Sequence, residues 1–279
     1  MAFFSGLLVI LGCTGADPSA GTTDSGNNSV QSPTETPRRV LHEMFTGSTC
    51  GPCLEADEIL HAVLDENPED VTHISYQIGS DPYITQEGVS RRMGYLPADA
   101  GSYSIPYLHV DGGDGLHPVE YNKDEGYQQS DFEGFLAATA VVELTASHSV
   151  VDQSIDVVVD VLPLAEVAGE DLHLHVAIIE GVTTLNVGTN GQKEFHHVMK
   201  KMLPDADGTP IVLVSGEAQS FDFSYTFQGD YTAETTLYEP VDHDTEHTVE
   251  EFDDLSVVVF VQDSETWAVH QSVWSGAGH

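Results

Sequence analysis

The chain is poor in positive charge. Its 279 residues include 8 Lys and Arg against 46 Asp and Glu, a formal net charge of −38, and the last cation, Lys201, is followed by 16 acids. Because such a surface repels phosphate groups, nucleic acid and anionic membrane surfaces are excluded as partners. The simplest interpretation of so many carboxylates is a strongly hydrated surface suited to a salty medium.

Several catalytic signatures are missing, and cysteine is scarce. The sequence has no P-loop, no GxGxxG after a predicted strand, no GxSxG elbow and no HExxH helix, so we expect none of the activities tied to those motifs and no cofactor. Cys13, Cys50 and Cys53 are its three cysteines. A chain long enough for two domains does not need disulfides to hold its core, so these cysteines are available for chemistry.

The N-terminal apolar run is too short for a permanent membrane helix. Residues 2–11 end in ILGC at Cys13, whereas a spanning helix needs about 20 apolar residues. The pattern resembles a lipobox, where a bacterial lipoprotein signal is cleaved before a cysteine that is then acylated. It departs from that pattern because no Lys or Arg precedes Arg38. We expect a signal peptide over residues 1–12 and a lipid anchor on Cys13; the alternative is a free or mispaired thiol.

Residues 13–37 are predicted to form a tether. After Cys13 the stretch TGADPSAGTTDSGNNSVQSPTETP is rich in Ser, Thr, Gly, Pro and Asn and has almost no apolar side chains. Such a segment cannot offset its ordering entropy, so we expect it to be disordered. It would hold the folded part of the protein away from a membrane.

The pair Cys50 and Cys53 lies between a predicted strand, from Arg38 to Thr46, and a predicted helix. The apolar stripe of that helix is Ala56, Ile59, Leu60, Val63 and Leu64. At a helix N-terminus, unpaired N–H groups and the positive end of the dipole favour a thiolate. Cys50 is therefore the candidate nucleophile, and Cys53 the resolving thiol.

The acids near the start of this helix act against the dipole. Glu55, Asp57 and Glu58 lie within two turns of Cys50. We expect them to keep the Cys50 pKa nearer 7 than the ~3.5 of the strongest oxidants. The pair would then be a mild redox couple, closer to a reductant or isomerase than to an oxidase.

Three interpretations of the CxxC pair are open: a redox-active disulfide, a static staple, or half of a metal site. A loop this short gains little as an entropic staple. A metal would need two more ligands, and no pattern places His42 or His61 beside the cysteines. Exposure of Cys50 near Pro106 would favour exchange, whereas burial under the second half of the chain would favour a scaffold.

Further elements complete a predicted first domain over residues 38–142. Residues 71–79 and 107–110 have strand patterns, and residues 84–96 and 130–142 have helix patterns. The order resembles the thioredoxin fold, and Ile105-Pro106 is similar to the cis-proline loop that lies against the CxxC in that fold and helps to bind partner polypeptide. The resemblance implies an α/β thioredoxin-like domain with Cys50, Cys53 and Pro106 at its site.

A narrower resemblance rests on VLHEMFTGSTCGPCLEA (40–56), which is similar to the EEFTGxxCGxC stretch of the outer membrane protein 28 family of bacterial envelope lipoproteins. Weaker similarities lie at 174–181, 196–203 and 257–272. The resemblance implies an outer-membrane lipoprotein with a β-rich part after the thioredoxin-like part. Thr49 is a departure, because redox-active thioredoxin relatives commonly carry Trp there; without that aromatic shelf, efficient general reductase activity is not expected.

From Val141 the pattern changes to strands. In residues 221–227 four aromatic side chains alternate with polar ones, which indicates a strand with one wet face. The predicted strands are VVELTA, SIDVVVDVLPL, LHLHVAIIE, EFHHVMKKM, TPIVLVS, SFDFSYTF, LSVVVFVQD and WAVHQSVW. We predict that residues 143–279 form an all-β sandwich domain, immunoglobulin-like in architecture.

Histidines and acids in this half raise a metal hypothesis. His173 and His175 share a strand face, His196 and His197 are adjacent, and DHDTEHTVEEFDD (242–254) combines two His with seven carboxylates. Polar side chains on a wet strand face and an acidic loop explain the same pattern. We therefore assign no metal site.

Two functions from different classes follow. The first is a lipid-anchored envelope protein that exchanges thiols and disulfides with protein partners through the CGPC pair. The second is a non-enzymatic outer-membrane lipoprotein, periplasmic or surface-exposed, whose β-sandwich binds an envelope partner or ligand while CGPC is a structural disulfide. Fold alone does not choose between them.

Overall fold

The structure, a computed structural model, describes residues 33–113, 115–116, 118, 126–233 and 239–276. In these residues the helices are α1 (Cys53–Leu64), α2 (Gln86–Gly94), α3 (Gln129–Leu136) and the short 3-10 helix η1 (Phe252–Asp254). The strands are β1 (Val40–Thr46), β2 (Val71–Gln77), β3 (Tyr107–Val110), β4 (Val142–Val151), β5 (Ser154–Pro163), β6 (Leu172–Thr183), β7 (Phe195–Leu203), β8 (Thr209–Pro210), β9 (Gln219–Thr226), β10 (Asp230–Tyr231), β11 (Glu246–His247), β12 (Leu255–Asp263) and β13 (Val269–Trp274).

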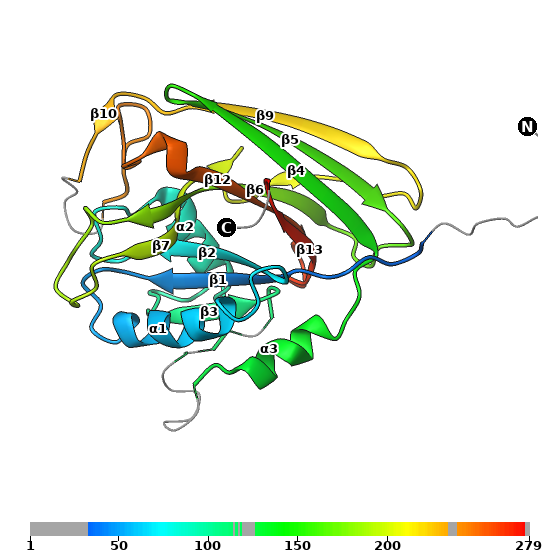
Figure 1. Cartoon of the computed structure of the whole chain (residues 1–279), viewed down its shortest axis with the longest axis horizontal. Coiled ribbons are helices and arrows are strands. Elements are labelled where there is room, and N and C mark those ends of the chain that lie inside the picture. The colour runs from blue at the N-terminus through cyan, green and yellow to red at the C-terminus, as the bar shows by residue number, and fades with distance from the viewer. Residues whose placement is uncertain (1–32, 114, 117, 119–125, 234–238, 277–279) are drawn as a thin grey trace, which may run out of the picture. The chain divides into compact units, whose positions relative to one another are not determined.

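One large sheet draws its strands from both halves of the chain (Figure 1). Its order is β13-β12-β6-β7-β2-β1-β3, with β8 paired to β6. The pairs β1–β2 and β2–β7 are parallel, whereas β1–β3, β6–β7, β6–β12 and β12–β13 are antiparallel. The expected fold class, a thioredoxin-like α/β domain followed by an all-β sandwich, is therefore wrong. Strands assigned to the sandwich extend the sheet that starts with β1 and β2.

The error has a physical origin. A repeating pattern of apolar residues identifies a strand and its buried face, but it does not identify the strand's neighbours. The run LSVVVFVQD is apolar at nearly every position, and β12 is buried along its whole length. Continuous burial of this kind is typical of a central strand that is covered on both faces, and a sandwich strand with one wet face would alternate.

A second sheet of three strands, β4-β5-β9, covers one face of the large sheet. Inward-facing side chains of β4 and β5 pack against alternate residues of β6 and β12, such as Val176 and Val259. Successive residues of β9 alternate between half-buried and exposed. This alternation confirms the wet face predicted for residues 221–227. Of the predicted strand TPIVLVS, only Thr209–Pro210 form a strand, β8.

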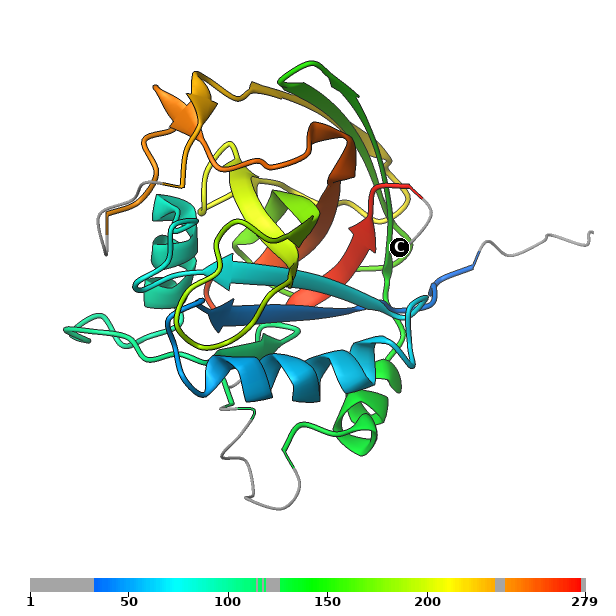
Figure 2. The same cartoon turned by 60° about the vertical axis from the view of Figure 1, so that its left-hand side comes forward.

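The helices cover the sheet near β1 (Figure 2). α1 and α3 pack against Val40 and Met44, on the same face as the three-stranded sheet. Leu41 and Phe45 point to the other face, where Val89 of α2 packs. α1 agrees closely with its prediction, whereas α3 ends at Leu136, before the predicted end at residue 142.

The large sheet curls, so that β13 at one edge of the strand order lies beside β1. The N–H of Arg39 donates to Oε1 of Gln271 (2.9 Å), and the hydroxyl of Thr72 donates to that of Ser272 (2.7 Å). Figure 1 shows β13 running close to β1. β13 therefore stabilises the chain at the start of β1 and the strand β2 beside it.

Candidate functional site

The cysteine pair lies at the turn between β1 and α1, as predicted. β1 ends at Thr46, α1 begins at Cys53, and a disulfide joins Cys50 to Cys53 with their Cα atoms 5.4 Å apart. Cys50 is half-buried, whereas Cys53 has no exposed surface. Gly51 and Pro52 between them are exposed. Only one end of the disulfide is therefore open to a partner.

Backbone hydrogen bonds fix the shape of the turn. The N–H of Cys50 donates to the carbonyl of Gly47 (3.1 Å), and that of Cys53 donates to the carbonyl of Cys50 (3.2 Å). Gly47 is required by space, since a Cβ there would lie 2.7 Å from the carbonyl oxygen of Ile78 and 3.3 Å from Cδ1 of Ile105. The turn is thus pressed against the chain that follows β2.

A buried carboxylate supports the same turn. Asp81, 1% exposed, accepts hydrogen bonds from the N–H of Ser48 (2.7 Å) and the N–H of Tyr83 (2.8 Å). Burial raises the pKa of Asp81, although these donors oppose the rise. The hydroxyl of Thr49, which occupies the position expected for Trp, donates to the carbonyl of Ser80 (2.7 Å).

The loop before β7 covers the other side of the turn. The N–H of Asn190 donates to the carbonyl of Ser48 (3.0 Å), and its side-chain amide donates to the carbonyl of Gly47 (3.3 Å). Gly188 packs so closely that a Cβ would lie 2.5 Å from the Ser48 carbonyl oxygen. The second half of the chain thus supports the cysteine turn while leaving Cys50 partly open.

Pro106 lies at the same end of the sheet. β3 begins at Tyr107, which pairs with Phe45 near the end of β1. The Ile105–Pro106 peptide bond is cis, and Pro106 is buried. The side chain of Ile105 packs against Gly47, three residues before Cys50. The structure thus brings the proline loop to the strand end where the cysteine turn starts.

The acids of α1 differ from one another. Glu55 and Glu58 are exposed, but Asp57 is 8% exposed and accepts a hydrogen bond from Nε2 of Gln192 (2.8 Å). Burial raises the pKa of Asp57 to about 7, partly offset by Gln192 and reinforced by the charge of Glu58. Asp57 therefore carries a full negative charge only part of the time at neutral pH, which weakens the expected opposition of three negative charges to the helix dipole. The sequence shows an acid at this position but not its burial.

A cavity of about 530 Å³ starts one residue after the disulfide. It runs along α1 from Leu54 to Asp65 and is closed on the other side by residues 191–194 and by His196 and His197. Asp57 and Glu58 also line it. A group bound here would contact the helix that carries the cysteines.

The histidines and acids singled out in the sequence fall into two groups: some have partners within the fold, and others line the cavity beside α1. His175 is buried and stacks on Phe260, whereas His173 contacts the Asp207 carbonyl (2.7 Å). In the acidic loop, Asp242 accepts hydrogen bonds from the residues that follow it, which is a local turn. His42 contacts the hydroxyl of Tyr127 (2.9 Å) on the face covered by α1 and α3. These groups serve the fold, but His61, His196 and His197 line the cavity beside α1.

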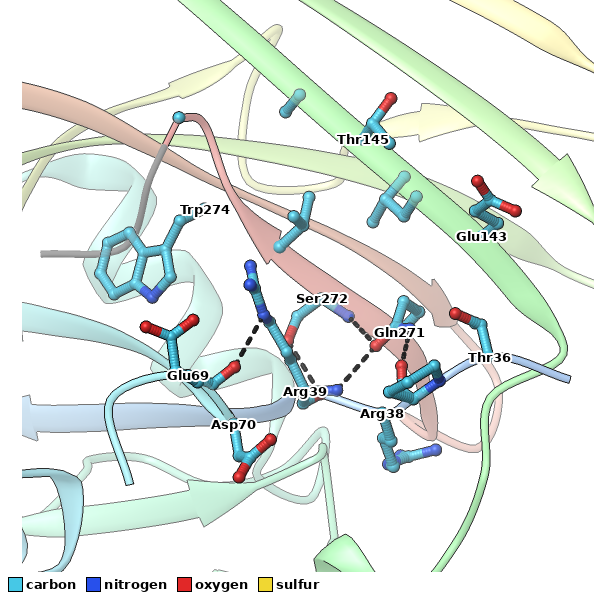
Figure 3. A pocket seen from close by; sticks show the side chains of 15 residues that line it. Thr36, Arg38, Arg39, Glu69, Asp70, Glu143, Thr145, Gln271, Ser272 and Trp274 are labelled. Carbon is cyan, nitrogen blue, oxygen red and sulfur yellow. Dashed lines mark hydrogen bonds between the residues drawn. The ribbon is translucent and has the colours of Figure 1, made fainter. Parts of the chain in front are cut away.

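Another cavity, about 470 Å³, lies between the first described residues and β13 (Figure 3). Nε of Arg39 donates to the carbonyl of Glu69 (2.9 Å), and Gln271 links the N–H of Arg39 to the carbonyl of Pro37. Thr145 and Glu143 of β4 form its far wall. Its described lining contains neither Cys nor His.

Two observations concern the predicted membrane attachment. The predicted lipid-bearing residue, Cys13, the signal peptide and most of the tether lie outside the described residues. Among the helices that the structure describes, none combines the length and the apolar character needed to cross a membrane.

Comparisons with known proteins support the architecture. No protein-family model and no curated protein matches the sequence. The chain is similar to HBP35 of Porphyromonas gingivalis, with a TM-score of 0.59 and 14% identity over 86% of this chain and 75% of that one. It is also similar to a structure from Agrobacterium tumefaciens, with a TM-score of 0.53 and 15% identity over 88% and 99%.

A domain of the outer membrane lipoprotein Omp28 from Porphyromonas gingivalis matches 50% of this chain and 89% of its own length, with 18% identity and a TM-score of 0.30. The HBP35 and Agrobacterium structures show that the arrangement of strands and helices is shared with other bacterial proteins. Membership of the outer membrane protein 28 family stays a prediction that rests on the stretch VLHEMFTGSTCGPCLEA (40–56).

Proposed function

We propose that this protein exchanges thiols and disulfides with protein partners in the bacterial cell envelope, through Cys50 and Cys53. The observation that carries the proposal is the unequal exposure of the pair: Cys50 is half-buried at the surface turn, and Cys53 is completely buried. A partner can therefore reach only one of the two sulfurs. Such an arrangement separates the attacking cysteine from the resolving one.

The exchange proceeds in two steps. In the reduced protein the Cys50 thiolate attacks a partner disulfide, which forms a mixed disulfide and releases one partner thiolate. The Cys53 thiolate then attacks Sγ of Cys50, which forms the Cys50–Cys53 disulfide and releases the second partner thiolate. The partner gains two electrons and the protein loses two; the oxidised protein runs the same steps in reverse.

Local structure supports both steps. The residue that precedes α1, Pro52, provides no side-chain cap, so the positive helix end faces the cysteine turn and favours the Cys50 thiolate. Asp57 lies one turn after Cys53 on the same helix, and residues four apart lie on one helix face. A carboxyl whose pKa is about 7 is suited to take the proton of the Cys53 thiol and return it.

The reduction potential tests this proposal. We would equilibrate the compact unit Pro33–His279 with glutathione or dithiothreitol buffers and measure the fraction of the Cys50–Cys53 disulfide. A potential between about −270 and −120 mV, the range of working oxidoreductases, is the expected result. A potential below about −300 mV would mark a structural bond and favour the non-enzymatic lipoprotein.

A pair of single-cysteine variants tests the division of roles. With Cys53→Ser, oxidised glutathione should form a stable mixed disulfide on Cys50, because the resolving thiol is gone. With Cys50→Ser, the buried Cys53 should react at least tenfold more slowly. Equal reaction rates in the two folded variants would contradict the assigned roles.

The cellular location is part of the same proposal. A lipobox-like sequence that ends at Cys13 supports an anchored envelope protein with its folded part outside the cytoplasm. In a bacterium that processes lipoproteins, Cys13→Ser should move the protein from the membrane fraction to the soluble fraction. Retention of the variant in the membrane fraction would argue against the anchor.

A further inference from the structure

Four histidines meet between α1 and the large sheet. His61 lies on α1, His73 on β2, and His196 and His197 on β7. Their ring centroids are 4.9 Å apart for His61 and His196, 5.5 Å for His61 and His73, and 5.3 Å for His73 and His197. The sequence shows only the adjacent pair, because the other two rings arrive through the pairing of β2 with β7 and the packing of α1.

The backbone at His197, in this cluster, has an unusual conformation. His197 has a φ of +53°, in the left-handed region that residues other than glycine seldom adopt. Beside it, β7 pairs with β2 only through Val198 and Ser75. Local irregularities of this kind redirect a side chain at the cost of ladder hydrogen bonds. Here Nδ1 of His197 lies 3.1 Å from Nδ1 of His73.

The cluster also contains buried ring nitrogens. Among the residues that the structure describes, Nε2 of His61 and Nε2 of His73 have no hydrogen-bond partner, and His73 is fully buried. Unpaired buried polar atoms are costly, so a metal ion bound through Nε2 of His61 would stabilise the fold.

We propose that His61, His73 and His197 bind a divalent first-row transition-metal ion, for which Zn²⁺ is the simplest case. Two nitrogen ligands of a tetrahedral zinc ion lie about 3.3 Å apart, since each Zn–N bond is about 2.0–2.1 Å. The Nδ1 atoms of His73 and His197 are already 3.1 Å apart. An ion between them would replace their mutual contact with two coordinate bonds.

The third ligand needs a small movement. No three His, Cys, Asp or Glu side chains in the described part of the chain are placed to hold a metal ion as they stand. The His61 ring is 5.5 Å from that of His73 and 6.4 Å from that of His197, measured between centroids. A side-chain rotation of His61 toward the pair would complete three imidazole ligands, the set that zinc uses when its fourth position is open.

Two carboxylates lie near His61, the third ligand. Nε2 of His61 lies 3.8 Å from Oδ1 of Asp57, and its Nδ1 lies 3.9 Å from Oδ1 of Asp65. Both carboxylates lie close to the His61 ring, so either can support the ring nitrogen that does not bind the metal, as carboxylates usually do for a metal-bound histidine. His61, Asp65, His73 and His197 also line a cavity of about 340 Å³, so Asp65 or a water molecule can occupy the fourth position.

The site is separate from the proposed exchange reaction. None of its ligands is a cysteine, and the net charge of −38 favours the approach of any cation. Because its ligands come from α1, β2 and β7, the metal would clamp the helix that carries the cysteines to the sheet.

Zinc binding by the full chain tests the proposal. The protein, with its disulfide intact and metal removed by a chelator, would be titrated with Zn²⁺ at pH 7.5 against a chromophoric competitor. We expect one tight site per chain, and a loss of affinity of at least tenfold for each of His61→Gln, His73→Gln and His197→Gln. His173→Gln, in the other histidine pair, and Cys50→Ser with Cys53→Ser should bind as the unmodified protein does.

Cobalt provides a readout that does not depend on affinity. Co²⁺ in the same site should show the visible absorption of a tetrahedral nitrogen and oxygen set, and the spectrum should be lost in His61→Gln. His61 is half-buried, whereas His73 is fully buried, so the His61→Gln variant keeps the test valid if His73→Gln does not fold. Absence of a stoichiometric site, or equal zinc affinity in folded His61→Gln and the unmodified protein, would overturn the proposal.

Discussion

Nε2 of Gln192 donates a hydrogen bond to Oδ2 of Asp57 over 2.8 Å, although 135 residues separate them in the sequence. The bond attaches the loop before β7 to the helix that carries the cysteines. It also fixes a buried acid one helical turn after Cys53. The pH dependence of this protein should follow from that placement.

The first prediction concerns Asp57→Asn. Because the pKa of Asp57 is raised from 3.8 to about 7 in the folded protein, the unfolded chain releases this proton at lower pH than the folded one. The free energy of unfolding therefore falls as pH rises from about 4 to 7. Asparagine keeps the acceptor for Gln192 without the charge, so the variant should be more stable than the unmodified protein at pH 8, by about 2–4 kcal/mol.

Urea unfolding at pH 8 and pH 4.5 measures this effect, and the gain should vanish at the lower pH. Glu58→Gln, a change to an exposed acid on the same helix, should shift stability by less than about 0.5 kcal/mol. A gain of equal size at both pH values would contradict the assignment of the buried proton to Asp57.

The histidine cluster predicts the opposite trend at lower pH. The pKa of His61 is lowered from 6.5 to about 4, so between these values the unfolded chain binds a proton that the folded protein does not. Stability should therefore decline as pH falls from 6.5 to 4. In the presence of a chelator, His61→Gln should remove about 1–3 kcal/mol of that decline. An unchanged pH profile in His61→Gln would contradict this origin, and His173→Gln provides the control.

A buried ion pair predicts a strong mutational effect on stability. Nζ of Lys200 lies 3.0 Å from a carboxylate oxygen of Glu180, and neither side chain is exposed. Lys200 also donates to the carbonyl of Thr248 (2.8 Å) and lies 3.8 Å from the centre of the Tyr83 ring. Lys200→Met leaves a buried unpaired carboxylate, so we expect a loss of about 3–5 kcal/mol in the free energy of unfolding.

A second change should recover much of that loss. The carboxylate of Glu180 accepts hydrogen bonds from the backbone N–H groups of Glu250 and Glu251. Glutamine at position 180 keeps one acceptor oxygen for these donors and removes the charge. Lys200→Met combined with Glu180→Gln should therefore be more stable than Lys200→Met alone in the same chemical unfolding measurement. If the double variant were the less stable of the two, the cost would come from lost packing of the lysine and not from the unpaired charge.

Two glycines of the cysteine motif provide a matched pair. A Cβ on Gly47 would lie 2.7 Å from the carbonyl oxygen of Ile78, whereas a Cβ on Gly51 would meet nothing within 4 Å. Gly47→Ala should lower the free energy of unfolding by about 1–3 kcal/mol because the turn has to shift. Gly51→Ala should change it by less than about 0.5 kcal/mol. Equal thermal unfolding curves for the two variants would show that the turn does not press on Ile78.

Local features of this chain were predictable from its sequence. The apolar stripe of α1, the turn that carries Cys50 and Cys53, and the alternation of β9 all depend on residues close together in the chain. The cis bond before Pro106 was expected from family resemblance and is present, whereas the one before Pro204 was not expected.

The relations between distant segments were not predictable. Five strands assigned to a separate sandwich, β6, β7, β8, β12 and β13, belong to the sheet of β1 and β2. The burial of Asp57 and the meeting of His61 with His73 depend on the same pairings. Hydrophobic periodicity contains no information on which strand lies next to which, so these features appear only in three dimensions.

The position of β13 beside β1 has a consequence for how the protein is made. During synthesis, β1 emerges from the ribosome more than 200 residues before Gln271 and Ser272, which bond to Arg39 and Thr72. Domains usually fold as units as the chain emerges, but here the early strands have no complete set of neighbours until β13 has been made. The growing chain therefore exposes its first strands until that point, and its dense carboxylates, through mutual repulsion, would keep unfinished chains apart.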